Sequence, residues 1–454
     1  MKKLWQKNWQ LNAFIESFET KDDFSMDQKL VKADVLQSIA HAKMLCKIGI
    51  LSKSELSKLT KALILILDLN GKGKFTLSMG EEDIHTKIEN FLTKEAGNAG
   101  KKIHTARSRN DQVITATRLF TKEELLAIWK GLLDCIKSLV AFAKKYEFVP
   151  MPGYTHMQKA MPSSLGVWAG SFAQNFLDDL SVLKTAFAIN NQSPLGSAAG
   201  FGVPLAIDRK YTAQLLGFEK VQENVLAVQS ARGKIEANIV SSLISILSTI
   251  NKLATDVLLY TTAEFNYFTV SQSLLTGSSM LPQKRNVDVA ELLRSKVHIV
   301  LGNYTALVSL SSNLPSGYNR DLQDSKKPLF DSFEIAKGSL YAANVLIKNI
   351  TPNVEVLEKS MTAGIFATHK AIELVKKGMP FRQAYQKVGR DLQNLSTMDV
   401  DNSLKQSTHI GATGNLGLKK LIKMLAEEQK MLKKEKKEFE VAVTYLINGG
   451  GETI

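Results

Sequence analysis

The chain has 454 residues, of which 44% are hydrophobic and 22% are charged, and its formal net charge is +14. This composition is typical of a globular protein with a large core, and it excludes collagenous, low-complexity and disordered chains. The positive charge is compatible with a lysine-rich solvated surface or with attraction of an anionic partner, but no interleaving of basic and aromatic residues indicates a nucleic-acid site.

The N-terminal residues and the two cysteines indicate the compartment. Residues 1–8 carry charge but are not followed by the apolar segment of a signal peptide. Cys46 and Cys135 lie far apart and allow neither a disulfide framework nor a CxxC metal motif. The uncharged residues 297–319 contain a histidine, serines and a proline, which is untypical of a membrane span. We therefore expect a cytoplasmic protein that does not enter a membrane.

Along the chain the dominant pattern is helical. Apolar residues recur at three- and four-residue steps within residues 172–183 and 239–257, and no proline occurs between Pro204 and Pro282. No strand-type alternation with hairpin turns predicts a sheet. These patterns predict an all-α fold built on a bundle of long helices. Clusters of proline and glycine predict loops at residues 150–153, 194–204, 276–282 and 315–317.

The first polar constellation lies in residues 104–112. Arg107, Arg109 and Asn110 supply two guanidinium groups and an amide within a short stretch. Such a set could clamp a carboxylate in bidentate fashion. The alternative is an ion-pair network on the surface.

The second constellation lies in residues 152–162, where His156 and Thr155 follow a Pro-Gly pair and precede a helix start. A lone histidine is more often a structural residue than a catalyst. The functional alternative is proton transfer, which a histidine performs near neutral pH.

The third constellation is residues 276–286. A glycine is followed by Ser278 and Ser279, and then by Lys284 and Asn286. The stretch is compatible with a flexible linker or with a mobile active-site lid rich in backbone N–H donors. The next helix contains Glu291 close to its start.

The fourth constellation is residues 317–326. Tyr318, Gln323 and Lys326 are spaced so that they could reach one ligand from a loop running into a helix. The alternative is an ordinary exposed helix start.

These four strings resemble signatures of a known group of enzymes. Residues 276–286 resemble the GSSxMPxKxN signature of the fumarase/aspartase superfamily, and residues 104–112 resemble the HTGRSRNDQ motif of its argininosuccinate lyase branch. The other two strings resemble the PGYTHxQxAxP and YNKDLQEDK segments. The resemblance covers about residues 26–390 and includes further segments at residues 82–85, 191–197, 288–296 and 379–384.

The resemblance implies a fold and an assembly. The fold is all-α, with a fumarase/aspartase-like division into an N-terminal helical domain (1–107), a central long-helix bundle with most motifs (108–360) and a C-terminal helical domain (361–454). The family is homotetrameric, with bundles packed together and each active site built from three subunits.

The resemblance also implies a reaction. Argininosuccinate is split into arginine and fumarate, the last step of arginine biosynthesis, by anti β-elimination through a stabilised carbanion. By position, Ser278 is the base, Lys284 stabilises charge, His156 handles the leaving-group proton and Glu291 pairs with His156. The family uses no metal or organic cofactor. The implied substrate-holding residues are Ser108, Arg109, Asn110, Thr155, Asn286, Tyr318, Gln323 and Lys326, with Asp83, His85, Arg107, Ser279 and Asp23 as further candidates.

The sequence also departs from the family pattern, which puts in question how the arginine end of the substrate is held. The departures are Asp23, Ala231, Gly233, Leu281 and Tyr385. Two other interpretations therefore stay open. One is a superfamily relative acting on another N-substituted succinate, such as adenylosuccinate lyase. The other is a non-catalytic structural or binding protein that reuses the fold, against which the retention of Ser278, His156, Lys284 and Glu291 argues.

Overall fold

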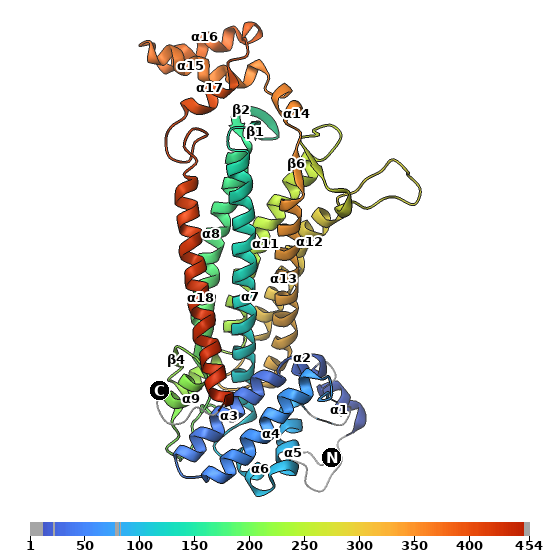
Figure 1. Cartoon of the computed structure of the whole chain (residues 1–454), viewed down its shortest axis with the longest axis vertical. Helices are drawn as coiled ribbons and strands as arrows, with labels where there is room; N and C mark the ends of the chain where they lie inside the picture. The colour runs from blue at the N-terminus through green and yellow to red at the C-terminus, as the bar shows by residue number, and fades with distance from the viewer. Residues whose placement is uncertain (1–11, 21–22, 78–80, 82, 449–454) are drawn as a thin grey trace.

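The computed structural model describes residues 12–20, 23–77, 81 and 83–448. A tall bundle of long helices carries a helical group at each end (Figure 1). One end group is formed by the first part of the chain and contains α1 (Ala13–Thr20), α2 (Asp23–Lys29), α3 (Val31–Lys47), α4 (Lys53–Gly71), α5 (Ile84–Ala96) and α6 (Asn98–Lys102).

The bundle confirms the all-α class and the expected long helices. The periodic residues 172–183 and 239–257 lie inside α8 and α11, where their apolar side chains are buried. Helix α7 packs on α8 and α13, and α11 packs on α8, α12 and α13. The bundle helices are α7 (Arg109–Lys145), α8 (Leu165–Asn190), α11 (Lys234–Tyr260), α12 (Asp288–Leu310) and α13 (Lys326–Lys348), and the short α9 (Arg209–Leu215) and α10 (Val225–Ser230) lie in the connection between α8 and α11.

The rest of the chain forms the other end group and then returns. Helix α18 runs back along α7 toward the N-terminal helices (Figure 1). The division into three domains at residues 107 and 360 stays a prediction. The helices of this part are α14 (Val354–Lys359), α15 (Ala367–Lys376), α16 (Phe381–Arg390), α17 (Val400–Gln406) and α18 (Leu418–Asn448), with the short 3-10 turns η3 (Ala363–Phe366) and η4 (Leu392–Asn394) between them. Two further 3-10 turns, η1 (Gln272–Leu274) and η2 (Arg320–Ser325), lie earlier in the chain.

Short strands pair two by two. The pairs are β1 (Pro150–Thr155) with β2 (Gln158–Ser164), β3 (Gln192–Ser193) with β4 (Lys220–Val221), and β5 (Phe268–Val270) with β6 (Ile350–Pro352). The expectation of a loop at residues 150–153 was wrong, because these residues form β1. The β1–β2 hairpin pairs Pro152 with Pro162 and shifts register between Gly153 and Tyr154. Prolines and a bulge are tolerated in an isolated two-stranded ribbon, and they conceal the alternation of a strand.

By length and composition alone, α11 could cross a membrane, and it is the one helix among the described residues that passes this test. Its apolar character has a local explanation. Helix α11 is packed among α8, α12 and α13 and contributes Leu243, Ile246 and Ile250 to the hydrophobic core.

Candidate active site

The start of α7 is fixed by a capping box. Ser108 is the N-cap, its Oγ accepts from the Asn110 backbone N–H at 3.3 Å, and its own N–H donates to Oδ1 of Asp111 at 2.9 Å. The other oxygen of Asp111 accepts 2.9 Å hydrogen bonds from the backbone N–H groups of Gly196 and Ala198. Asp111 therefore joins residues 104–112, the segment predicted to clamp a carboxylate and here called the clamp, to the 191–197 loop.

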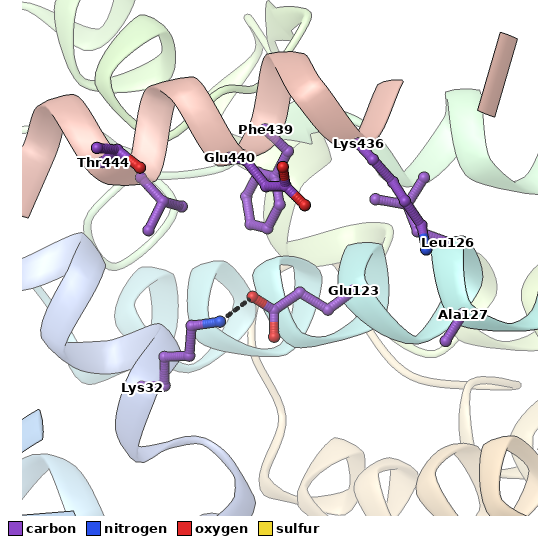
Figure 2. A pocket seen from close by; sticks show the side chains of 9 residues that line it. Lys32, Glu123, Leu126, Ala127, Lys436, Phe439, Glu440 and Thr444 are labelled. Atoms are coloured by element: carbon purple, nitrogen blue, oxygen red, sulfur yellow. Dashed lines mark hydrogen bonds and ion pairs between the residues drawn. The ribbon is translucent and has the colours of Figure 1, made fainter. Parts of the chain in front are cut away.

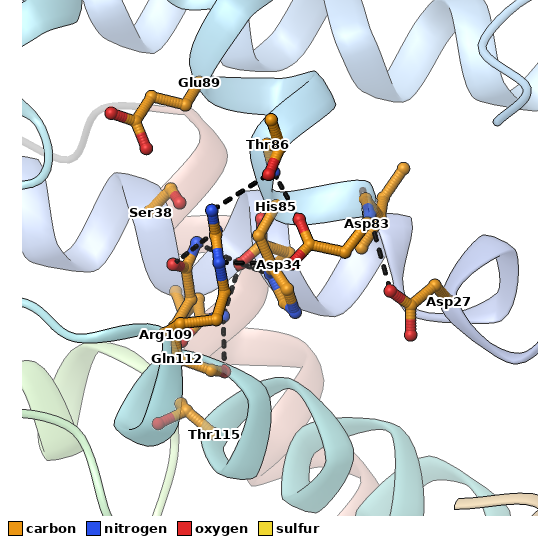
Figure 3. Close-up of polar contacts among 12 residues, drawn as sticks. Asp27, Asp34, Ser38, Asp83, His85, Thr86, Glu89, Arg109, Gln112 and Thr115 are labelled. Atoms are coloured by element: carbon orange, nitrogen blue, oxygen red, sulfur yellow. Dashed lines mark hydrogen bonds and ion pairs between the residues drawn. The ribbon is translucent and has the colours of Figure 1, made fainter. Parts of the chain in front are cut away.

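Arg109 is held on three sides (Figure 3). Its Nε lies 3.1 Å from Oδ2 of Asp83, its Nη2 donates to Thr86 at 3.0 Å, and its Nη1 donates to Gln112 at 3.2 Å. Asp83 is itself the N-cap of α5. The Arg109 side chain keeps 28% of its surface exposed. This arrangement presents a guanidinium of fixed orientation with part of its surface open to a ligand.

Two further candidates are buried beneath this clamp. Arg107 donates to Oγ of Ser38 at 2.9 Å, and His85 lies with its Nδ1 3.0 Å from Oδ1 of Asp34. Both side chains have little or no exposed surface. Within one chain they therefore support the clamp rather than line an open site.

The fourth constellation lies beside the clamp. Lys326, at the start of α13, forms a buried 2.6 Å ion pair with Asp27, and the second oxygen of Asp27 accepts from the Ile84 N–H at 3.4 Å. Gln323 donates to the Glu19 carbonyl at 2.7 Å. The contacts of Asp27 connect α13 to the start of α5, next to Asp83, and the contact of Gln323 connects η2 to α1. The first and fourth constellations therefore share one end of the bundle.

The other end of the bundle carries His156. His156 and Met157 form the turn between β1 and β2 and have φ values of 52° and 61°. Both side chains are exposed. Residues other than glycine adopt this left-handed region at a cost, and such strain is concentrated at functional sites. The hairpin therefore presents His156 and the preceding Thr155 at a strained, exposed tip.

The Ser278 loop is also at this end and extends away from the bundle (Figure 1). Its base is closed by two 3.0 Å backbone hydrogen bonds between Thr276 and Asn286. Oγ of Ser278 accepts backbone hydrogen bonds from Met280 at 3.2 Å and from Leu281 at 3.0 Å. N–H donors of this kind stabilise negative charge on an oxygen atom. Lys284 is exposed on the same loop.

Glu291 lies in the first turn of α12 and is exposed. In the described part of a single chain, no hydrogen bond or ion pair joins it to His156. The predicted pairing of Glu291 with His156 therefore stays a prediction.

Within one chain, the predicted site residues therefore lie in two groups, one at each end of the helical bundle. Helix α7 has 37 residues and, at 1.5 Å per residue, is about 55 Å long. The clamp lies at its N-terminal end, and the hairpin and the loop lie beyond its C-terminal end (Figure 1). At the clamp end are Ser108, Arg109, Asn110, Tyr318, Gln323, Lys326, Asp83, His85 and Arg107. At the hairpin end are Thr155, His156, Ser278, Ser279, Lys284, Asn286 and Glu291.

Most of the predicted site residues do not line the two cavities described next. A groove of about 300 Å³ lies between α7 and α18, beside the ion pair of Lys32 with Glu123, and no predicted site residue lines it (Figure 2). A groove of about 320 Å³ beside the hairpin is lined by Thr155 together with His369 and His409. Within the described residues, no group of three or more histidine, cysteine or acidic side chains is arranged to hold a metal ion.

Sequence reasoning missed several residues that build the clamp. Asp27, Asp34, Thr86 and Gln112 contact predicted site residues, and the guanidinium of Arg232 lies 5.3 Å from the ring centre of Tyr318. One available signal was the run of polar residues at helical spacing in α3, since buried polar residues need specific partners.

The structure explains the departure at Gly233. This residue is the N-cap of α11 with φ 82°, and its N–H donates to Glu236 at 2.6 Å. A Cβ atom there would lie 2.8 Å from the Cβ of Ser311, so the close approach suits glycine. Leu281 is exposed on the loop and Tyr385 is exposed on α16. Asp23 begins α2, but its side chain lies outside the described set.

Solved structures share the fold. An EDDS lyase in complex with formate matches with a TM-score of 0.81 and 19% identity, covering 97% of each chain. A class II fumarase from Schistosoma mansoni matches with a TM-score of 0.72 and 16% identity, covering 88% of this chain and 96% of the fumarase.

Sequence comparison identifies the family. A family model described as "Lyase" matches residues 13–302. An argininosuccinate lyase from Thermotoga neapolitana is 42% identical over 386 residues, which are 85% of this chain and 97% of that protein. An argininosuccinate lyase from Bacteroides thetaiotaomicron is 39% identical over 414 residues, which are 91% of this chain and 92% of that protein. The chain belongs to the argininosuccinate lyase family.

Proposed function

We propose that this protein is an argininosuccinate lyase that cleaves argininosuccinate to L-arginine and fumarate. Relatives with that activity in their names align with most of the chain. The observation that carries the chemical part of the proposal is the environment of Ser278, whose Oγ accepts two backbone N–H groups on an extended loop. Such donors favour an alkoxide, and the alkoxide is the form in which serine acts as a base.

The reaction follows from these groups. Ser278 removes the proton from the carbon next to a substrate carboxylate, and the negative charge moves into that carboxylate. Lys284, Asn286 and loop N–H groups stabilise the charge. The electron pair then forms the double bond of fumarate as the carbon–nitrogen bond breaks. The guanidinium nitrogen leaves as arginine and gains its proton from the side of His156, which Glu291 orients.

Arg109 has the role of holding a substrate carboxylate. Its guanidinium is fixed by Asp83, Thr86 and Gln112, yet part of its surface is exposed. A planar guanidinium of fixed orientation binds a carboxylate with two parallel hydrogen bonds. Ser108 and Asn110 are neighbours at the same helix start. Tyr318, Gln323 and Lys326 hold the substrate from the adjoining segment.

We also infer that the protein works as a homotetramer with shared active sites. The clamp and the serine loop lie at opposite ends of a helix about 55 Å long, so one chain cannot bring them to the same substrate. Helix α12 exposes large apolar side chains, including Leu292, Ile299, Leu301 and Val308. Apolar patches of this kind are typical of subunit interfaces. Antiparallel packing of bundles would place the loop of one chain beside the clamp of another.

The cytoplasm is the compartment that suits this proposal. Both cysteines are free thiols, and a reducing compartment keeps them so.

The test of the activity is direct. Purified protein is incubated separately with argininosuccinate, adenylosuccinate and aspartate, and fumarate is followed by its ultraviolet absorbance. We expect fumarate from argininosuccinate alone. Fumarate from another substrate only, or from none, would overturn the proposal.

Two variants test the base. Ser278→Ala should abolish turnover while the tetramer and substrate binding persist. Ser273→Ala is the matched control, because Ser273 is an exposed serine nearby whose hydroxyl contacts only Ser271 in the described structure. Near-normal turnover by Ser278→Ala would place the base elsewhere.

A further inference from the structure

Helix α3 carries a polar stripe on its buried side. Asp34, Gln37, Ser38 and His41 are buried and recur at the three- and four-residue steps that place side chains on one helix face. Burying polar side chains costs free energy unless each finds a partner. The stripe therefore indicates a specific arrangement of contacts rather than general packing.

Asp34 is the centre of these contacts. Its Oδ1 accepts a 2.9 Å hydrogen bond from Gln112, lies 3.0 Å from Nδ1 of His85, and also accepts from Gln37. Burial alone would raise the pKa of Asp34, but the nearby His85 and Arg107 outweigh it and lower that pKa to about 2. Asp34 is thus a buried carboxylate that remains charged at neutral pH.

The first connection from Asp34 to the clamp runs through Gln112. The amide nitrogen of Gln112 donates to Asp34, and its amide oxygen accepts from Nη1 of Arg109 at 3.2 Å. A carboxylate can only accept hydrogen bonds and a guanidinium can only donate them. The charge of Asp34 therefore selects the amide orientation in which the oxygen faces Arg109.

The second connection runs through His85. This residue lies in the first turn of α5, next to Thr86 and two positions after Asp83. Those two neighbours hold Nη2 and Nε of Arg109. Asp34 thus contacts both helices that hold Arg109 in place: it contacts α5 through His85 and α7 through Gln112 (Figure 3).

We propose that Asp34 is a positioning residue of the substrate site, which holds the Arg109 guanidinium in the orientation that grips a substrate carboxylate. The proposal rests on the proposed function. Asp34 is fully buried, so it acts on the substrate site through Gln112 and His85.

The first test is the Asp34→Asn variant, which keeps the side-chain size and removes the charge. We expect the KM for argininosuccinate to rise about tenfold and kcat to change less than about threefold, because a misoriented guanidinium weakens binding more than chemistry. The matched control is Asp179→Asn. Asp179 is also buried. It lies on α8 and accepts hydrogen bonds from the hydroxyl groups of Ser245 and Thr249 on α11, away from the clamp. The control should lose stability without a change in KM.

A double-mutant cycle separates positioning from general stability. In an Arg109→Lys background, where the forked guanidinium is absent, Asp34→Asn should raise KM by less than about twofold. An equal rise in both backgrounds would show that Asp34 does not act through Arg109 and would overturn the proposal. Gln112→Met tests the same connection if Asp34→Asn does not fold. Gln112→Met should raise KM as Asp34→Asn does in the wild-type background, and it should raise KM by less than about twofold in the Arg109→Lys background.

A crystal structure of Asp34→Asn, or of Gln112→Met, makes the outcome independent of the reaction. We expect the Arg109 guanidinium to move out of ion-pair distance from Asp83. Arg109 unmoved in the variant would overturn the positioning role even in an active enzyme. Conversely, absence of argininosuccinate cleavage by the wild type would overturn the proposed function, while the position of Arg109 would still decide the role of Asp34.

Discussion

Mixed tetramers test whether the two ends of different chains complete one site. The perturbation is a pair of inactive variants, Ser278→Ala at the loop end and Arg109→Met at the clamp end. Their positions are separated by a helix about 55 Å long, so they would disable different components of any shared site. Each variant alone should retain less than about 1% of wild-type kcat/KM, because removing a base or a charged clamp costs at least about a hundredfold.

The magnitude follows from the arrangement. When equal amounts of the two chains assemble at random, a site is intact only if its loop comes from the Arg109→Met chain and its clamp comes from the Ser278→Ala chain. Each condition is met half the time, so about a quarter of the sites regain activity. If one chain supplied both groups, no site would be intact.

The assay uses co-expressed chains with different affinity tags, purified over both columns and checked for a single tetrameric species by light scattering. The control pair is Ser278→Ala with Lys284→Ala. Both residues lie in one loop, so every site receives one damaged loop and no activity should return. Failure of the first pair to exceed the control pair would refute the shared-site reasoning. Recovery in the control pair would show that the activity does not come from complementation.

Three further outcomes follow from the geometry. His156→Asn should lower kcat by about 10²- to 10⁴-fold in steady-state kinetics, the range of general acid–base catalysis, and a loss below about tenfold would assign His156 a structural role. Asp111→Asn should lower the unfolding free energy by about 2–3 kcal/mol in chemical denaturation, because an amide N–H donor would then face the backbone N–H groups of Gly196 and Ala198. A loss of less than about 0.5 kcal/mol would contradict this reasoning. Burial lowers the pKa of Lys122 to about 8 from the 10.5 of the unfolded chain. Between about pH 8 and 10.5 the unfolded chain therefore holds more protons than the folded chain. As the pH rises through this range, the unfolding free energy of the wild type should rise by up to about 3 kcal/mol relative to that of Lys122→Met. Parallel pH profiles of the two proteins would contradict the burial effect.

Local sequence patterns predict the helices of this protein well. The apolar residues 172–183 lie within α8, and the apolar residues 239–257 lie within α11. These features depend on residues three or four positions apart, so they can be read from the chain alone. The Ser278 motif occupies a loop, as its proline and glycine neighbours indicate, whereas the same signals around His156 conceal a hairpin.

Contacts between distant segments could not be predicted in this way. The bond from Gln112 to Asp34 joins residues 78 positions apart, and the ion pair of Lys326 with Asp27 joins residues 299 positions apart. Nothing in the local pattern specifies such partners, because they depend on how helices pack. The left-handed backbone of His156 is a similar case, since it results from the tight turn of a hairpin that prolines conceal.

The two ends of the bundle differ in how far their residues are prepared for the reaction. At the clamp end, Arg109 and Lys326 are paired with acidic groups that are themselves anchored, so their orientation is fixed before any ligand arrives. At the other end, the Ser278 loop extends into solvent, with 85% of Met280 exposed. An exposed loop cannot exclude water, and a serine alkoxide requires a site closed to water. Neighbouring subunits would cover the loop and bring it to a clamp that is already oriented. Assembly would thus supply the enclosure that the chemistry requires.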